Sequence, residues 1–463
     1  DPTYRRACLN FMHHCSDQLY EHHAGAFHGK STLPMLANTL KSCMLSEDIG
    51  VVFQTLHTFN NVVSISSDSK FKVLVDTVQT LLERGAEEGN KNLITKVASL
   101  FSDQESGIYN LYDTKSAQKL LWQLIEISTD PSVPNSVFFQ TTHACIQFLS
   151  FNKKIAKTLK ETDFLQQLVE NMYRGCCQVE EIEDFDTVAH IEGEAEHTNR
   201  AELAKDLFDT LATSTPFSLV FDTIADLYQA NISSENWKER YGALAVLVYT
   251  IEGYADKMCA VYKPLLADVL SRCDDVHNRV RHQSVCVVSQ MLLHLAPRVQ
   301  IDMGAEVTEV LLQLTQNDPS MTVRSESLFS FNPLFDPSDE PEQSVPTKKK
   351  GKIHGPTLVR VVEMLLAKLD SDDAKSNDTV LSTTVENFGL IYHSCYESSS
   401  LALKLLPFTD QVLERIQCYL DDEYAYDPKE PKKKVQVCAL QTATLIVDTL
   451  HENTPAIDAA GID

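Results

Sequence analysis

The sequence predicts an all-α solenoid, in which antiparallel helix pairs stack on one another along the chain. Three observations carry this prediction. A sequence pattern recurs with a period near forty residues between positions 236 and 335. Elsewhere, apolar residues recur at three- and four-residue intervals, which is the spacing of one helix face. The composition is 43% hydrophobic and 23% charged with only 15 glycines in 463 residues, which favours helices over sheet.

The recurring pattern is aligned by three arginines, Arg240, Arg281 and Arg324, which lie 41 and 43 residues apart. A small residue follows each arginine by three positions, and an aspartate precedes the second and third arginines by six. These residues are Ala243, Ser284 and Ser327, and Asp275 and Asp318. Two helices of about 15 residues with two turns fill roughly forty residues, and neither helix buries its apolar face alone. The pattern resembles HEAT-repeat sequence.

The arginine of each copy is expected in the first turn of the second helix of its pair. From there it can reach back to the acidic residue of a neighbouring turn, so that Asp275 or Asp318 forms one rung of an arginine–aspartate ladder along the stack. The small residue one turn later lets helices approach closely. Trp237 opens the first copy. We therefore interpret these positions as architectural.

The rest of the chain divides around this segment. The turns before IGVVFQTLHTF, LITKVASLF and VFFQTTHACIQFL recur at similar spacing but lack the arginine. The chain starts without methionine inside a repeat-like segment, so we expect it to be a piece of a longer protein. The predicted parts are HEAT-like repeats over 1–178, an acidic insertion loop over 179–200, the clearest repeats over 201–335, a loop rich in proline and lysine over 336–356, and HEAT-like repeats over 357–463 that continue further.

Charge and cysteine content exclude some classes of partner. The formal net charge is -25, which disfavours nucleic acid or an anionic membrane as the main partner and favours basic proteins. The 12 cysteines form no CxxC pair, which is typical of free thiols in a reducing compartment. No run of eighteen apolar residues and no signal peptide is found.

The acidic insertion, EEIEDFDTVAHIEGEAE, interrupts the helical pattern. It has two interpretations, a solvated linker or a loop that docks a basic ligand on the inner face of the solenoid. Its candidate partner-binding residues are Glu180, Glu181, Glu183, Asp184, Asp186, Glu192, Glu194 and Glu196. Two lysine runs, at 348–352 and 432–434, resemble localisation signals, but a solvated loop or a helix start is the favoured interpretation of each.

Sequence motifs for chemistry are lacking. GAFHGKST ends like a phosphate-binding loop, but Ala24 stands where that loop needs a glycine. Cys8, Cys15 and His22 are seven residues apart, a spacing that suits zinc ligation but suits a packed helix surface better. No GxSxG elbow is present. We predict no enzyme activity, no cofactor and no metal ligand.

The segment from Glu180 to Phe335 resembles the importin-β (karyopherin-β) family of nuclear transport receptors. The resemblance lies in the acidic insertion, the following RAELAKDLFDTLA, the repeat that opens with WKERYGAL, and VRHQSVCVVSQMLLHLAP. It implies a right-handed superhelix of HEAT repeats that shuttles between cytoplasm and nucleus. It also implies three kinds of partner: cargo with basic segments, the GTPase Ran in its GTP state, and the phenylalanine-glycine (FG) repeats of nucleoporins.

The alternative is an armadillo-like helical scaffold outside transport. Such a HEAT-repeat platform, which assembles a multiprotein complex, shares the fold and the acidic charge but binds neither Ran nor FG repeats. An enzyme is a third possibility, which no motif supports.

Overall fold

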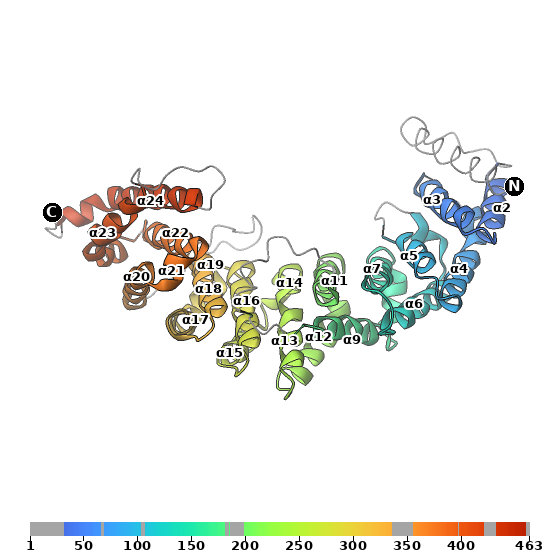
Figure 1. Cartoon of the computed structure of the whole chain (residues 1–463), viewed down its shortest axis with the longest axis horizontal. Helices are drawn as coiled ribbons and strands as arrows, with labels where there is room; N and C mark the ends of the chain where they lie inside the picture. The colour runs from blue at the N-terminus through green and yellow to red at the C-terminus, as the bar shows by residue number, and fades with distance from the viewer. Residues whose placement is uncertain are drawn as a thin grey trace. The chain divides into compact units, whose positions relative to one another are not determined.

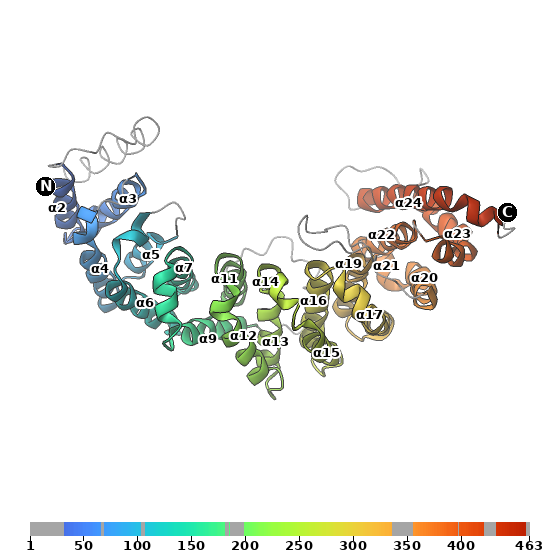
Figure 2. The ribbon, with the colours of Figure 1, turned by 180° about the vertical axis from the view of Figure 1, so that it is seen from behind.

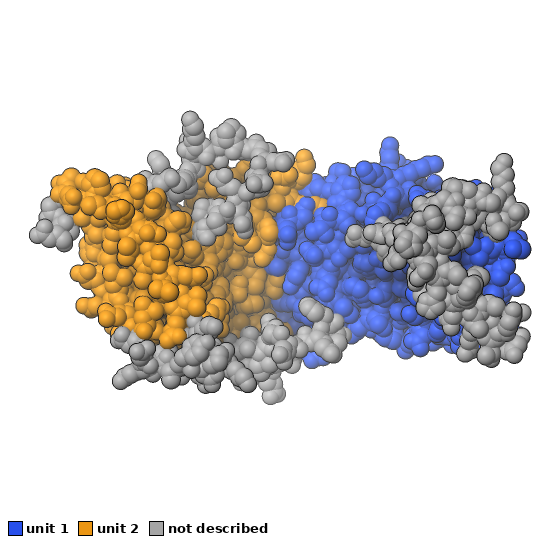
Figure 3. All heavy atoms as spheres, turned by 90° about the horizontal axis from the view of Figure 1, so that it is seen from above, with its two compact units in different colours: residues 1–180, 195–253 blue, residues 181–194, 254–463 orange. Residues whose placement is uncertain are grey.

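The computed structural model describes residues 32–65, 69–102, 107–180, 185, 199–335, 355–396, 398–420 and 432–459 (Figure 1). These residues form helices joined by turns and contain no strand. The chain divides into two compact units, unit 1 with residues 1–180 and 195–253 and unit 2 with residues 181–194 and 254–463 (Figure 3). Each unit stacks antiparallel helix pairs. The predicted all-α solenoid is therefore confirmed.

Unit 1 has two layers, because each helix contacts its sequence partner and the equivalent helix of the next pair. The first layer holds α2 (Thr32–Met44), α4 (Val75–Glu87), α6 (Thr114–Thr129), α9 (Phe164–Cys176) and α12 (Phe217–Asn231). The second layer holds α3 (Ile49–Ile65), α5 (Lys91–Ser99), α7 (Asn135–Phe151), α11 (Arg200–Ser214) and α13 (Trp237–Val248). Short helices η1 (Ser69–Leu74), η2 (Gly107–Leu111) and α8 (Lys153–Leu159) fill the connections. Helix α14 (Ile251–Met258) spans the boundary at residue 253.

Unit 2 repeats the two-layer arrangement, which Figure 2 shows from behind. Its first layer holds α15 (Tyr262–Arg272), α17 (Arg298–Asn317), α20 (Gly355–Leu369) and α23 (Ser399–Leu420). Its second layer holds α16 (Asn278–His294), α18 (Met321–Phe329) with α19 (Phe331–Phe335), α22 (Asp378–Ser394) and α24 (Lys432–Ala459). The short α21 (Asp372–Ser376) lies in the turn before α22.

Side-chain caps fix where the second-layer helices begin. The side chain of Asn236 accepts the Lys238 amide, that of Ser320 accepts the Val323 amide, and that of Asn377 accepts the amides of two residues in α22. Each cap satisfies amides that have no partner within the helix, which contributes about 1 kcal/mol. The turn sequences therefore set the start of each helix and with it the position of the ladder arginine.

Several sequence-based interpretations can be placed on this fold. Helix α24 starts at Lys432, so the second lysine run is a helix start, as favoured. The first lysine run, with Lys348, Lys349, Lys350 and Lys352, and the amino-terminal group around Cys8, Cys15 and His22 lie outside the described residues. Among the helices that are described, none combines the length and the apolar character needed to cross a membrane.

Candidate functional site

Each ladder arginine first binds its own turn. Arg240, Arg281 and Arg324 each occupy the fourth position of a second-layer helix. Their Nη1 atoms donate to the carbonyls six and five residues earlier, with the shorter distances at 2.7, 2.9 and 2.7 Å. The arginine therefore ties the intra-repeat turn to the helix that follows it, in the same geometry three times.

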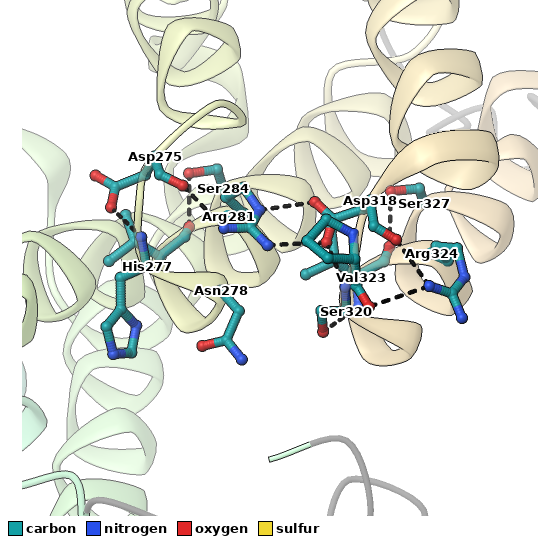
Figure 4. A network of polar contacts seen from close by, with 12 residues as sticks. Asp275, His277, Asn278, Arg281, Ser284, Asp318, Ser320, Val323, Arg324 and Ser327 are labelled. Carbon is teal, nitrogen blue, oxygen red and sulfur yellow. Dashed lines mark hydrogen bonds and ion pairs between the residues drawn. The ribbon is translucent and has the colours of Figure 1, made fainter. Parts of the chain in front are cut away.

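The other two nitrogen atoms of the Arg281 guanidinium bind a residue of the next repeat. Its Nε and Nη2 donate to the two carboxylate oxygens of Asp318 at 2.7 and 2.9 Å (Figure 4). The pair is buried, with 11% of the Arg281 side chain and 3% of the Asp318 side chain exposed. These hydrogen bonds raise the pKa of Arg281 above its usual value. Asp318 also accepts the Ser320 amide at 2.8 Å, so one carboxylate joins two adjacent repeats.

Arg324 continues the ladder to a residue that the repeat pattern did not identify. It donates from Nε and Nη2 to Asp373, both at 2.8 Å, and Lys368 donates to the same carboxylate at 2.6 Å. Asp373 stands 49 residues after Arg324, because α21 extends the turn before α22. The acidic run before the apolar residues of α22 was the signal that could have identified it.

The two cations hold the Asp373 carboxylate in its charged form. Hydrogen bonds first from Arg324 and then from Lys368 lower its pKa to about 2, against the opposing effect of burial. An unfolded aspartate has a pKa of about 3.9. A lowered folded pKa gives stability that is present above the unfolded pKa and is lost as pH falls through the folded pKa. The contribution of Asp373 is therefore lost between about pH 4 and pH 2.

This titration predicts a specific effect of Asp373→Asn. The variant is less stable than the parent chain at neutral pH, and the gap between the two narrows as pH falls from about 4 to about 2. Urea denaturation at several pH values measures the difference in unfolding free energy between the two chains. Plotted against pH, the slopes for the two chains should differ by up to the equivalent of one bound proton. A gap that stays constant over this range contradicts the assignment.

The remaining architectural positions pack on a helix, shape a turn or lie buried between helices. Trp237 packs edge-to-face against Tyr241 on α13, with ring centroids 6.4 Å apart, and Lys238 lies over the Trp237 ring. In unit 2, Asp275 accepts the His277 amide at 2.9 Å and so shapes the turn before α16. The small residues Ala243, Ser284 and Ser327 are fully buried between helices.

Within the acidic run 180–196, the structure describes only Glu180 and Phe185. Glu180 is exposed at the end of the segment that follows α9. Phe185 contacts α16, where its ring lies 4.9 Å from the Arg279 guanidinium and packs edge-to-face with His282 at 5.6 Å. Within unit 2, the insertion is therefore anchored on a second-layer helix. The other candidates, Glu181, Glu183, Asp184, Asp186, Glu192, Glu194 and Glu196, lie outside the described residues.

A hollow of about 480 Å³ lies between the consecutive first-layer helices α9 and α12 of unit 1. Tyr173 and Leu227 supply apolar lining, and Glu170, Arg174 and Asp226 supply charged groups. The Tyr173 hydroxyl donates to the Glu239 carbonyl of α13 at 3.1 Å. The hollow thus combines a ring held in place by a hydrogen bond with a charged rim.

Stacked two-layer helix pairs joined by an arginine–aspartate ladder define a HEAT-repeat solenoid. No family model matches the sequence. The fold is similar to solved structures of Kap121p, described as a karyopherin. The complexes of Kap121p with Pho4p and with Ste12p each give a TM-score of 0.77 at 14% identity. The complex with the extreme C-terminus of the protein phosphatase Cdc14p gives 0.76 at 15% identity.

These matches cover 99% of this chain and 42% of the Kap121p chain. The chain therefore spans about two fifths of the length of the structures that it matches. It shares the helical solenoid fold of these karyopherin structures, the fold that the sequence resemblance implied.

Proposed function

We propose that this chain belongs to a nuclear transport receptor of the importin-β type and acts by binding other proteins, without enzyme activity. The receptor binds cargo with basic segments, releases it when Ran-GTP binds, and passes nuclear pores through contacts with FG nucleoporins. It shuttles between cytoplasm and nucleus. The observation that carries the proposal is the likeness of nearly the whole chain to cargo-bound Kap121p, with TM-scores up to 0.77.

The charge of the chain supports basic cargo. Its net charge is -25, and eight of its carboxylates are concentrated in the insertion that starts at Glu180. The contact of Phe185 with α16 holds part of that insertion at a second-layer helix of unit 2. Such a concentration of carboxylates along the sequence attracts lysine- and arginine-rich segments over roughly one Debye length, about 8 Å at physiological salt.

Two other features support the remaining partners. In the hollow between the consecutive first-layer helices α9 and α12, Tyr173 and Leu227 offer apolar contacts to a phenylalanine side chain of an FG repeat. Each repeat of a solenoid contacts only its neighbours, so small shifts at many interfaces add to a large change in curvature. Such a change would let Ran-GTP favour a curvature that binds cargo poorly.

Binding to Ran tests the proposal directly. The full-length protein should bind Ran-GTP about tenfold or more tightly than Ran-GDP at physiological salt, a difference of about 1.4 kcal/mol or more. Isothermal titration with Ran in each nucleotide state measures it. Equal binding to both states, or binding to neither, contradicts a transport receptor and leaves a HEAT scaffold for another complex.

The same assay examines the acidic insertion. A variant with the eight carboxylates from Glu180 to Glu196 changed to their amides should lose affinity for a basic import-signal peptide or for Ran-GTP. The matched control neutralises eight exposed carboxylates on first-layer helices, which alters net charge equally. If both variants bind alike, net charge and not the insertion attracts the ligand.

A further inference from the structure

Three potential metal ligands meet between two second-layer helices of unit 2. His282 and Cys286 lie on α16, and Glu326 lies on α18. One ligand atom from each of the three residues lies within 4.8 Å of the others, and all three side chains are half-buried. The sequence gives no metal-binding motif here, because the glutamate comes from the next repeat. We propose that these residues form a zinc site that joins α16 to α18.

Helix geometry accounts for the meeting of these side chains. His282 and Cys286 are four residues apart, so they project from the same face of α16 on successive turns. Glu326 follows Arg324 by two residues and lies on the neighbouring helix α18. The pairing of Arg281, the residue before His282, with Asp318 in the turn before α18 fixes the register of the two helices. The ladder thus places the ligands beside one another.

The distances fit a zinc ion after a small contraction. The His282 Nε2 atom lies 4.0 Å from the Cys286 Sγ and 3.9 Å from the Glu326 Oε2. Ligand atoms around tetrahedral zinc are roughly 3.3–3.6 Å apart, given bond lengths of about 2.0–2.3 Å. The third pair, the Cys286 Sγ and a Glu326 carboxylate oxygen, lies within 4.8 Å. Movements of up to about an ångström by these half-buried side chains therefore close the site.

The donor set selects the kind of ion. A thiolate with an imidazole favours zinc over magnesium or calcium, which prefer oxygen ligands. Three protein ligands leave the fourth tetrahedral position for water or for a donor from a partner. Cys286 also differs from Cys273 and Cys395, because it is half-buried and accessible to an ion, whereas those two thiols are buried in the core.

The site lies against the anchored part of the acidic insertion. The Phe185 ring packs edge-to-face against the His282 ring, so it shields one side of the ligand and restricts its orientation. An ion bound at Nε2 would hold the imidazole still and thereby the surface on which Phe185 rests. Zinc binding would then stabilise the attachment of the insertion to α16.

Zinc titration of the full chain against a chromophoric chelator tests the site. The parent chain should bind one more equivalent than Cys286→Ser, and Glu326→Gln should weaken that equivalent by more than the roughly 10–100-fold loss typical of outer-shell changes. Cys259→Ser, at another half-buried cysteine, is the matched control and should titrate as the parent does. Because thiol and imidazole must lose protons, affinity should fall as pH falls.

Cobalt gives a second readout, an absorption band that reports whether the bound ion is held by a thiolate. Cobalt bound through a thiolate shows a charge-transfer absorption in the near ultraviolet. Cys286→Ser should lose one equivalent of this band, and Cys259→Ser should keep it. Circular dichroism in chelator confirms that each variant folds. The proposal is overturned if Cys286→Ser binds as much metal as the parent or keeps the band, or if Glu326→Gln leaves the affinity unchanged.

Discussion

Replacing Asp318 by alanine should lower the free energy of unfolding of unit 2 by about 3 kcal/mol. The substitution leaves the Arg281 guanidinium, only 11% exposed, without the carboxylate that accepts two of its hydrogen bonds. Removing one partner of a buried ion pair costs about 3–5 kcal/mol, because the other charge stays buried and unpaired. The Ser320 amide also loses its acceptor. Urea denaturation and hydrogen exchange of α16 and α18 measure the loss.

Asp370 offers a control with the same chemistry at the surface. It also accepts two hydrogen bonds from an arginine, Arg415, at 2.7 and 3.1 Å. About half of each of these two side chains is exposed, 44% of the arginine and 55% of the aspartate. Exposed pairs contribute about 0–1 kcal/mol, so Asp370→Ala should change stability little. Equal effects of the two substitutions would show that the ladder adds no more than a surface ion pair.

The ladder also shows how far the sequence predicts this fold. The offsets of 41 and 43 residues, with an aspartate six positions before the arginine, predicted contacts between an arginine and the aspartate of a neighbouring turn. The structure pairs Arg281 with Asp318, a choice of partner that the pattern left open. Arg281 lies in the first turn of α16, and Asp318 lies in the turn before α18 of the next repeat. Asp373 was missed because α21 changes the offset, so a rule of constant spacing cannot find it.

The candidate sites were less predictable for a different physical reason. His282 and Cys286 are recognisable as a pair because one helix face brings them together, but the third ligand, Glu326, depends on how two helices pack. Composition identified the acidic insertion as a charged segment, yet its single described aromatic residue, Phe185, makes the contact with α16. These site residues are therefore brought together by contacts between separate segments, which the spacing of apolar residues within one helix does not predict.

Gly253 in α14 is a further position whose role depends on a contact between helices. Its replacement is the second substitution for which we expect a large loss of stability. A Cβ atom on Gly253 would lie 2.4 Å from the carbonyl carbon of Ala212 and 2.5 Å from its oxygen, which belong to the backbone of α11. Backbone atoms cannot rotate away, so the two helices must separate. Gly253→Ala should therefore lower the free energy of unfolding of unit 1 by about 2–3 kcal/mol, the cost of overpacking a core. Thermal or urea denaturation of the full chain, with hydrogen exchange of α11, measures it.

Gly304 is the matched control, because it also lies inside a helix, α17, but a Cβ there meets nothing within 4 Å. Without a clash, the higher helix propensity of alanine and the reduced freedom of the unfolded chain should make Gly304→Ala more stable by about 0.5–1 kcal/mol. The same substitution thus has opposite signs at two glycines that the sequence pattern does not distinguish. If Gly253→Ala is also stabilising, α14 can move away from α11 at little cost, and this helix contact does not constrain the stacking of the repeats.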